Sequence, residues 1–207
     1  MAVPKFGCSK YSNTASITQT SQSSGQTVSV CGPIFTAAQG MGYWQNKNGQ
    51  GIITGGASTL GVCNSGTWLR QYAPYQDLSA TATCRQVAQY VVNVIKNANS
   101  SGSSMNPMLK AQMLGTGLDT YFSDPALGGN ILGAPSPIGG VAIDLTMISG
   151  ASGSFGGATS LTVSQTLAFA ASQSNVGGSL WYGNVKSTQE PAKNTFEAID
   201  NMTAFAP

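Results

Sequence analysis

The sequence predicts a mainly α protein, a helical domain of four to six helices with long Gly-rich loops. A disulfide-tied N-terminal β-hairpin precedes it. Three observations lead to this class. Apolar and polar residues alternate only near the start of the chain, apolar residues recur at helical spacing from residue 82 onward, and 26 glycines interrupt the pattern. We expect residues 1–34 to form the hairpin segment and residues 35–207 to form one compact helical domain.

The hairpin is expected from two short stretches with strand-like alternation. Ala15 and Ile17 share one face of the first stretch, and Val28 and Val30 share one face of the second. Residues 21–26 (SQSSGQ) supply the turn. Because a two-stranded ribbon is only marginally stable in water, we expect it to pack on the rest of the protein or to gain a strand from elsewhere.

Helical segments are expected from apolar spacing and from end signals. A short helix over 41–47 should end at Asn48-Gly49, and a helical turn over 67–72 should stop near Pro74. The strongest helix covers 82–98. Another starts at Asn106 as N-cap, with Pro107 first in the helix, and ends at Asp124-Pro125.

Two capping-box patterns predict the last two helices. Thr162 with Gln165 starts one, and Ser187 with Glu190 starts the other, although Pro191 favours a start nearer Glu190. Between the helices, residues 141–145 (VAIDL) are expected to form a short strand.

Four cysteines indicate an oxidising, extracellular setting. Cys8, Cys31, Cys63 and Cys84 form no CxxC pair, and the chain has no His to complete a zinc site. Three pairings are open. We favour Cys8–Cys31 and Cys63–Cys84, because each closes a local loop; four buried thiols are the alternative.

The composition argues against an enzyme. Only 16 of 207 residues are charged and none is His, whereas Ser plus Thr number 44 and Asn plus Gln number 27. General acid–base chemistry depends on titratable groups, and His is the commonest of them. The basic residues are scattered, so no nucleic-acid site is expected, and no apolar run is long enough to span a membrane.

Candidate binding residues are aromatic. Trp44 with Tyr43, Trp68, and Trp181 with Tyr182 lie beside Gly, Asn or Gln. Sugar rings stack on exposed aromatic rings while amides bind the hydroxyls, so glycans are candidate partners. The alternative is that these rings fill the core.

Metal and cofactor expectations are few. No cofactor is expected. Ca²⁺ is possible at Asp119, Asp124 and Asp144, which flank a Gly-rich loop, although no EF-hand spacing is present. Surface and helix-capping roles are the alternative for these three acids.

Two stretches resemble secreted bacterial surface-protein modules of uncharacterised function. They are GMGYWQNKNGQGII at 40–53 and MLKAQMLGTGLDTYFSDP at 108–125. The resemblance implies a secreted or cell-surface location, and it carries no catalytic residues over to this chain. Where the module's motif carries His after Trp, this chain has Gln45-Asn46-Lys47, so no metal role carries over.

Taken together, these features predict an extracellular structural or self-assembling protein, such as a filament, matrix or surface-layer subunit. Its partner would be a further copy of itself, because few like charges keep neighbouring molecules apart. A cell-surface adhesion or carbohydrate-binding module is the alternative.

Overall fold

The computed structural model describes residues 8–31, 35–98 and 104–205. Chain contacts divide it into two units with the boundary between Phe35 and Thr36. About half of the chain is helical, and short antiparallel strand pairs accompany the helices. The protein is therefore helical with small β elements, which is less strongly α than the sequence suggests.

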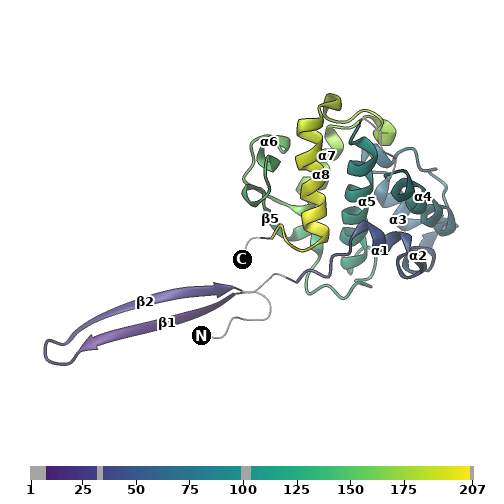
Figure 1. Cartoon of the computed structure of the whole chain (residues 1–207). Helices are drawn as coiled ribbons and strands as arrows, with labels where there is room; N and C mark the ends of the chain where they lie inside the picture. The colour runs from purple at the N-terminus through teal and green to yellow at the C-terminus, as the bar shows by residue number, and fades with distance from the viewer. Residues whose placement is uncertain (1–7, 32–34, 99–103, 206–207) are drawn as a thin grey trace. The chain divides into compact units, whose positions relative to one another are not determined.

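The N-terminal unit is a β-hairpin, as predicted. Strand β1 (Cys8–Ile17) pairs with β2 (Gln22–Cys31) over ten consecutive residue pairs (Figure 1). The turn lies at residues 18–21 and not at 21–26, because Ser21 adopts a left-handed φ of 53° and Gly25 pairs within β2. The register sets Cys8 opposite Cys31, but the side chains of both, and hence the predicted bridge, lie outside the described part.

The second unit holds eight α-helices in the described residues, against the four to six expected. The α-helices are α1 (Met41–Gln45), α2 (Lys47–Thr54), α3 (Asn64–Leu69), α4 (Cys84–Asn97), α5 (Asn106–Ser123), α6 (Ala151–Ser154), α7 (Val163–Ser172) and α8 (Lys186–Asp200). The 3₁₀ turns are η1 (Ala73–Tyr75), η2 (Ile138–Gly140), η3 (Leu145–Met147), η4 (Val176–Gly178) and η5 (Tyr182–Asn184). Within the described residues no helix has both the length and the apolar character needed to cross a membrane.

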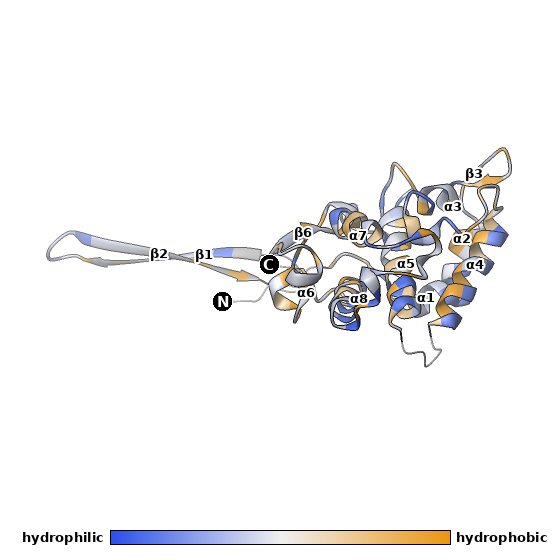
Figure 2. Ribbon diagram, turned by 90° about the horizontal axis from the view of Figure 1, so that it is seen from above, coloured by the Kyte–Doolittle hydropathy of each residue, from blue (hydrophilic) through white to orange (hydrophobic). Residues whose placement is uncertain are grey.

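Helix α5 is the centre of this unit. It packs against α8, and α1, α3, α4 and α7 also contact it (Figures 1 and 2). Every residue from Leu109 to Ser123 is buried, whereas Pro107 and Met108 at the start of the helix are half-buried. Close neighbours are possible because Gly115 and Gly117 lack side chains: a Cβ at Gly115 would lie 3.0 Å from Asp200 Oδ2.

The region around Trp44 forms two helices instead of the single one expected. Asn46 ends α1, and its side chain then caps α2 by accepting bonds from the N–H groups of Asn48 and Gly49. Asn48-Gly49 therefore begins a helix and does not end one. At Gly49 an added Cβ would lie 2.5 Å from the carbonyl oxygen of Tyr43, so the absence of a side chain lets α2 turn tightly against α1.

A disulfide joins Cys63 to Cys84, as predicted. Its sequence separation is 21 residues, and a loop of that size corresponds to roughly 3 kcal/mol in the chain-entropy model. The bond ties the small hairpin of β3 (Ser58–Thr59) and β4 (Val62–Cys63) to the start of α4. It therefore fixes the loop that precedes α3.

End signals were partly correct. Thr162 and Gln165 form the predicted capping box of α7, and β5 (Ala142–Asp144) pairs with β6 (Ser160–Thr162). Ser187 caps nothing, since α8 begins at Lys186 without a side-chain cap. Its first turn is held instead by the buried Gln189, which donates to Asn106 Oδ1 at 2.6 Å and to the carbonyl of Trp181 at 2.8 Å.

Asn106 is likewise not an N-cap. The helix starts at this residue, and its amide donates to the carbonyl of Ser179 and to Asn184 Oδ1, both at 2.8 Å. This amide joins α5 to the C-terminal third of the unit, so tertiary bonds take the place of the predicted local cap.

Candidate functional site

Two of the three candidate tryptophans belong to the core. Trp44 is fully buried: its Nε1 donates to Asp119 Oδ1 at 3.1 Å, and its ring stacks on Phe122. Trp181 is also fully buried, and its Nε1 donates to the carbonyl of Ala170 at 2.7 Å. Neither ring can stack on a ligand at the surface, because both faces are covered by protein.

Their tyrosine neighbours are half-buried. Tyr43 packs edge-on against Trp44, with ring centroids 5.3 Å apart. Tyr182 has a left-handed φ of 49°, and its hydroxyl is buried without a hydrogen-bond partner in the described residues. Burial raises the pKa of Tyr182 above its ordinary value. This phenol therefore stays neutral and offers no surface group to a ligand.

Trp68 differs, because it lines an open cavity that we call the Trp68 hollow. The cavity has a volume of about 510 Å³. The hollow is defined by Thr59, Val62, Asn64, Thr67, Trp68, Tyr121, Ala126 and Leu127. Its volume falls within the range of small-molecule sites, about 300–1,000 Å³. None of these lining residues is charged.

The wall of the Trp68 hollow is braced from two sides. The Trp68 ring meets Tyr72 edge-on at 5.3 Å and Tyr121 at 5.6 Å, which attaches α3 to the central helix α5. Asn64 directly follows the disulfide residue Cys63, and its Oδ1 accepts a bond of 2.9 Å from the Thr59 hydroxyl. The aromatic and polar groups of the hollow are therefore held in place before any ligand arrives.

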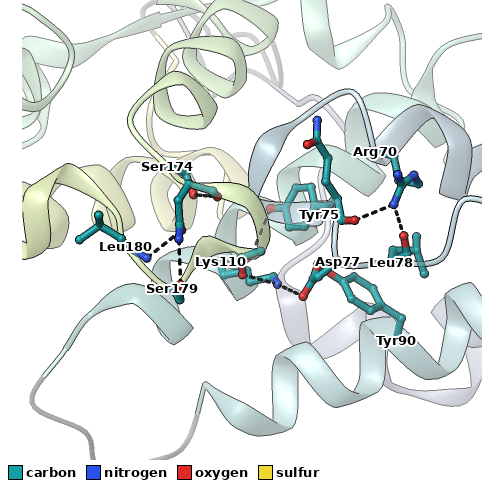
Figure 3. A network of polar contacts seen from close by, with 12 residues as sticks. Arg70, Tyr75, Asp77, Leu78, Tyr90, Lys110, Ser174, Ser179 and Leu180 are labelled. Carbon is teal, nitrogen blue, oxygen red and sulfur yellow. Dashed lines mark hydrogen bonds and ion pairs between the residues drawn. The ribbon is translucent and has the colours of Figure 1, made fainter.

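A second cavity lies around Lys110, and we call it the Lys110 cavity. Its volume is about 460 Å³, and Asp77, Tyr90, Asn106, Lys110 and Ser179 are among its lining residues. Figure 3 shows Asp77 between Lys110 and Tyr90. Lys110 Nζ donates to Asp77 Oδ2 at 2.7 Å and to the carbonyl of Gly177 at 2.9 Å. The Tyr90 hydroxyl donates to Asp77 Oδ1 at 2.6 Å.

Most polar groups of the Lys110 cavity already serve the protein. The Asn106 side chain bonds to three partners, as described above, and the Ser179 hydroxyl accepts a bond from Asn175 Nδ2 at 2.9 Å. Burial, and then the bond to Asp77, raises the pKa of Tyr90. The cavity therefore resembles a structural network of polar contacts between α4, α5 and the η1 and η4 turns more than a ligand site. No sequence pattern pointed to it, because its residues come from distant segments.

Two carboxyl groups lie inside the core. Asp119 is fully buried and accepts bonds from Trp44 Nε1 at 3.1 Å and from the Gln39 N–H at 2.9 Å. Asp200 is also buried; Thr116 donates to its Oδ1 at 2.6 Å, while Oδ2 has no partner in the described residues. Burial raises the pKa of both carboxyls, and the nearby Asp119 raises that of Asp200 further.

Each of the three acids predicted as calcium ligands has a different structural role. Asp119 serves Trp44 in the core, whereas Asp124 ends α5 and accepts a 2.8 Å bond from the Ala126 N–H. Asp144 caps η3 through Thr146, and these bonds lower its pKa. In the described ranges, no group of three or more His, Cys, Asp or Glu side chains is placed to share a metal ion.

Comparisons with known proteins identified no related protein. A scan against protein-family models and searches of curated proteins and of solved structures found no match to this chain. The resemblance to secreted surface modules therefore remains a prediction from the sequence.

Proposed function

We propose that this protein is an extracellular, self-assembling structural subunit whose copies join by strand addition at the N-terminal hairpin. The observation that carries the proposal is the pairing of β1 with β2 over ten residue pairs in a sheet of only two strands within the described residues. Each strand of such a sheet has one partner, so each presents an outer edge of backbone N–H and C=O groups to a further strand.

The edges lack the features that normally prevent strand addition. Natural edge strands carry charges, prolines or bulges. Residues 8–31 contain one charged residue, Lys10, and no Pro, and the register runs without a bulge. Ile17 and Val28 are exposed on the strands, 54% and 45% respectively. A strand from another copy would cover backbone and apolar surface together.

The low charge supports the self-assembly part of the proposal, and the disulfide supports the extracellular part. With nine basic and seven acidic residues in 207, the net charge is only +2, so repulsion between copies is weak. The Cys63–Cys84 bond fits an oxidising compartment. The function needs no catalytic group, which agrees with the absence of His and with the enclosure of Asp119 and Asp200 in the core.

The proposal is tested by placing a charge on the ribbon. The double variant Thr14→Lys with Ser24→Lys changes one exposed residue on each strand. Thr14 pairs with Gly25 and Ser24 pairs with Ala15, so the two lysines lie on opposite faces of the ribbon. We expect it to abolish association in sedimentation velocity, because adding a strand would bring lysines close to those of the next copy. The control Ala168→Lys with Gln173→Lys adds the same two charges to exposed residues in α7 and directly after it, and it should leave association unchanged. Equal association of the ribbon variant and wild type would contradict the proposal.

A further inference from the structure

Trp68 is distinguished from the other tryptophans by its indole N–H. The N–H groups of Trp44 and Trp181 donate to Asp119 and to the Ala170 carbonyl. Within the described residues the N–H of Trp68 has no hydrogen-bond acceptor, and the ring is only half-buried. A half-buried indole with an unused donor, at the wall of a 510 Å³ cavity, has the properties of a ligand contact.

The polar groups of the Trp68 hollow leave further bonding capacity. Asn64 uses its Oδ1 to accept from Thr59, and no bond from its Nδ2 is made to a described residue. The Tyr121 hydroxyl also has no partner there and can both donate and accept. Trp68, Asn64 and Tyr121 therefore line one cavity and carry an indole donor, an amide donor and a phenol that make no hydrogen bond to the described residues.

Apolar and uncharged surroundings define the class of ligand. Val62 and Leu127 line the hollow beside the Trp68 ring, and no Lys, Arg, Asp or Glu lines it. A charged ligand would lose its hydration here without gaining an opposite charge. A sugar ring suits such a site, because its C–H face packs on an aromatic ring while its hydroxyls bond to amide and phenol groups.

We infer that the Trp68 hollow binds a neutral oligosaccharide. Trp68 is the stacking platform, and Asn64 and Tyr121 bind hydroxyls. An apolar peptide segment fits less well, because burying the indole and amide donors under apolar side chains would leave them without acceptors. None of its lining residues belongs to the N-terminal hairpin of β1 and β2, so this binding is an activity additional to self-assembly.

Saturation-transfer NMR on the full chain tests the inference, since it observes the sugar and tolerates large assemblies. The probes are cellobiose, maltotriose and N,N′-diacetylchitobiose, with a heparin-derived disaccharide as the charged comparator and acetyl-Leu-Leu amide as the peptide comparator. We expect saturation on ring protons of at least one neutral sugar and none on the comparators. Binding of the peptide alone, of the charged sugar alone, or of no probe would overturn the inference.

Variants assign the binding to the hollow. Trp68→Ala should abolish sugar binding, and Trp68→Phe, which keeps a ring but removes the N–H, should weaken it about threefold to tenfold, as for one lost hydrogen bond. Leu180→Ala, an exposed residue outside the hollow, is the control. If Trp68→Phe and Asn64→Ala each kept full sugar binding, the sugar site would lie elsewhere and the inference would be wrong.

The two proposals fail separately. Trp68→Phe should leave sedimentation unchanged, whereas the double lysine variant of the hairpin should leave sugar binding unchanged. Folding of each variant is checked by thermal unfolding, because Trp68 also packs on Tyr72 and Tyr121. If Trp68→Ala does not fold, the Trp68→Phe and Asn64→Ala results decide the matter.

Discussion

At the scale of single residues, buried polar groups form hydrogen bonds with partners that are far away in the sequence. Asp119 accepts from Trp44, 75 residues away, and Asn106 bonds to Asn184, 78 residues away. Sequence neighbours could not separate buried Trp44 and Trp181 from half-buried Trp68, because all three lie among small and polar residues. Distant segments cover the buried rings and supply their acceptors, and the local sequence holds no signal for which segments these are.

The buried carboxyls predict a pH dependence. Burial, and then the charge of Asp119, raises the pKa of Asp200 in the folded state, so the folded protein holds protons that the unfolded chain releases. Their contribution to stability is complete below the unfolded pKa of about 4 and decreases as pH rises above it. Asp200→Asn should flatten this decline and raise the free energy of unfolding at neutral pH by about 1–3 kcal/mol.

Asp119→Asn is the matched control, measured by urea unfolding between acidic and neutral pH. Both oxygens of Asp119 accept bonds, so an amide there leaves the Gln39 N–H or the Trp44 indole N–H without an acceptor. We expect a loss of about 1–3 kcal/mol at acidic pH and a smaller loss at neutral pH, because burial also raises the pKa of Asp119. If Asp200→Asn destabilised the protein as much, the assigned difference between the two carboxyls would be incorrect.

Two lysines form ion pairs of different kinds. Lys110 pairs with a residue of a distant segment, and Lys193 pairs with a residue of its own helix. Lys110–Asp77 and Lys193–Glu197 are both 2.7 Å pairs, with side chains 11% and 42%, and 16% and 45%, exposed. Lys110 additionally bonds the Gly177 carbonyl. Lys110→Met should cost about 1.5–3 kcal/mol in chemical denaturation. Lys193→Met, which breaks a pair within one helix, should cost about 0.5 kcal/mol or less. Equal losses in the two variants would contradict the stabilising role assigned to the contacts of Lys110.

At the scale of elements, sequence patterns predicted helices well when one face was apolar. The segment at 82–98 became α4 (Cys84–Asn97), and Thr162 with Gln165 capped α7 as expected. The same pattern failed at Ser187 with Glu190, where tertiary bonds of Gln189 hold the first turn. Around Gly49, glycines predicted a helix end, but here a glycine makes room for a neighbouring backbone.

Two glycines of α2 test this explanation. In Gly49→Ala the added Cβ would lie 2.5 Å from the Tyr43 carbonyl oxygen, so we expect destabilisation by about 1–3 kcal/mol. At Gly51 nothing lies within 4 Å, and Gly51→Ala should stabilise by up to about 1 kcal/mol through helix propensity. Thermal unfolding of both variants checks this, and effects of the same sign would refute the close approach.

At the scale of the whole molecule, the sequence predicted the N-terminal hairpin, and it predicted a more strongly helical remainder than the structure has. Alternation is a local pattern, so the strands near Ala15 and Val28 could be predicted, whereas the exact turn depended on the conformation of Ser21. Helix α5 showed an apolar stripe in sequence but is buried on all sides from Leu109 to Ser123, which only the packing of the other helices explains. The two cavities likewise bring together residues from distant segments.

The central claim is that strand edges with a single charged residue, Lys10, and no proline or bulge make this protein associate with itself. The most direct measurement is sedimentation velocity of the wild-type chain over increasing concentration, with electron microscopy of the same samples. We predict that the sedimenting mass rises with concentration and that fibres or sheets form. A single monomeric species at the highest concentration, with no ordered assembly on the grid, would contradict the claim.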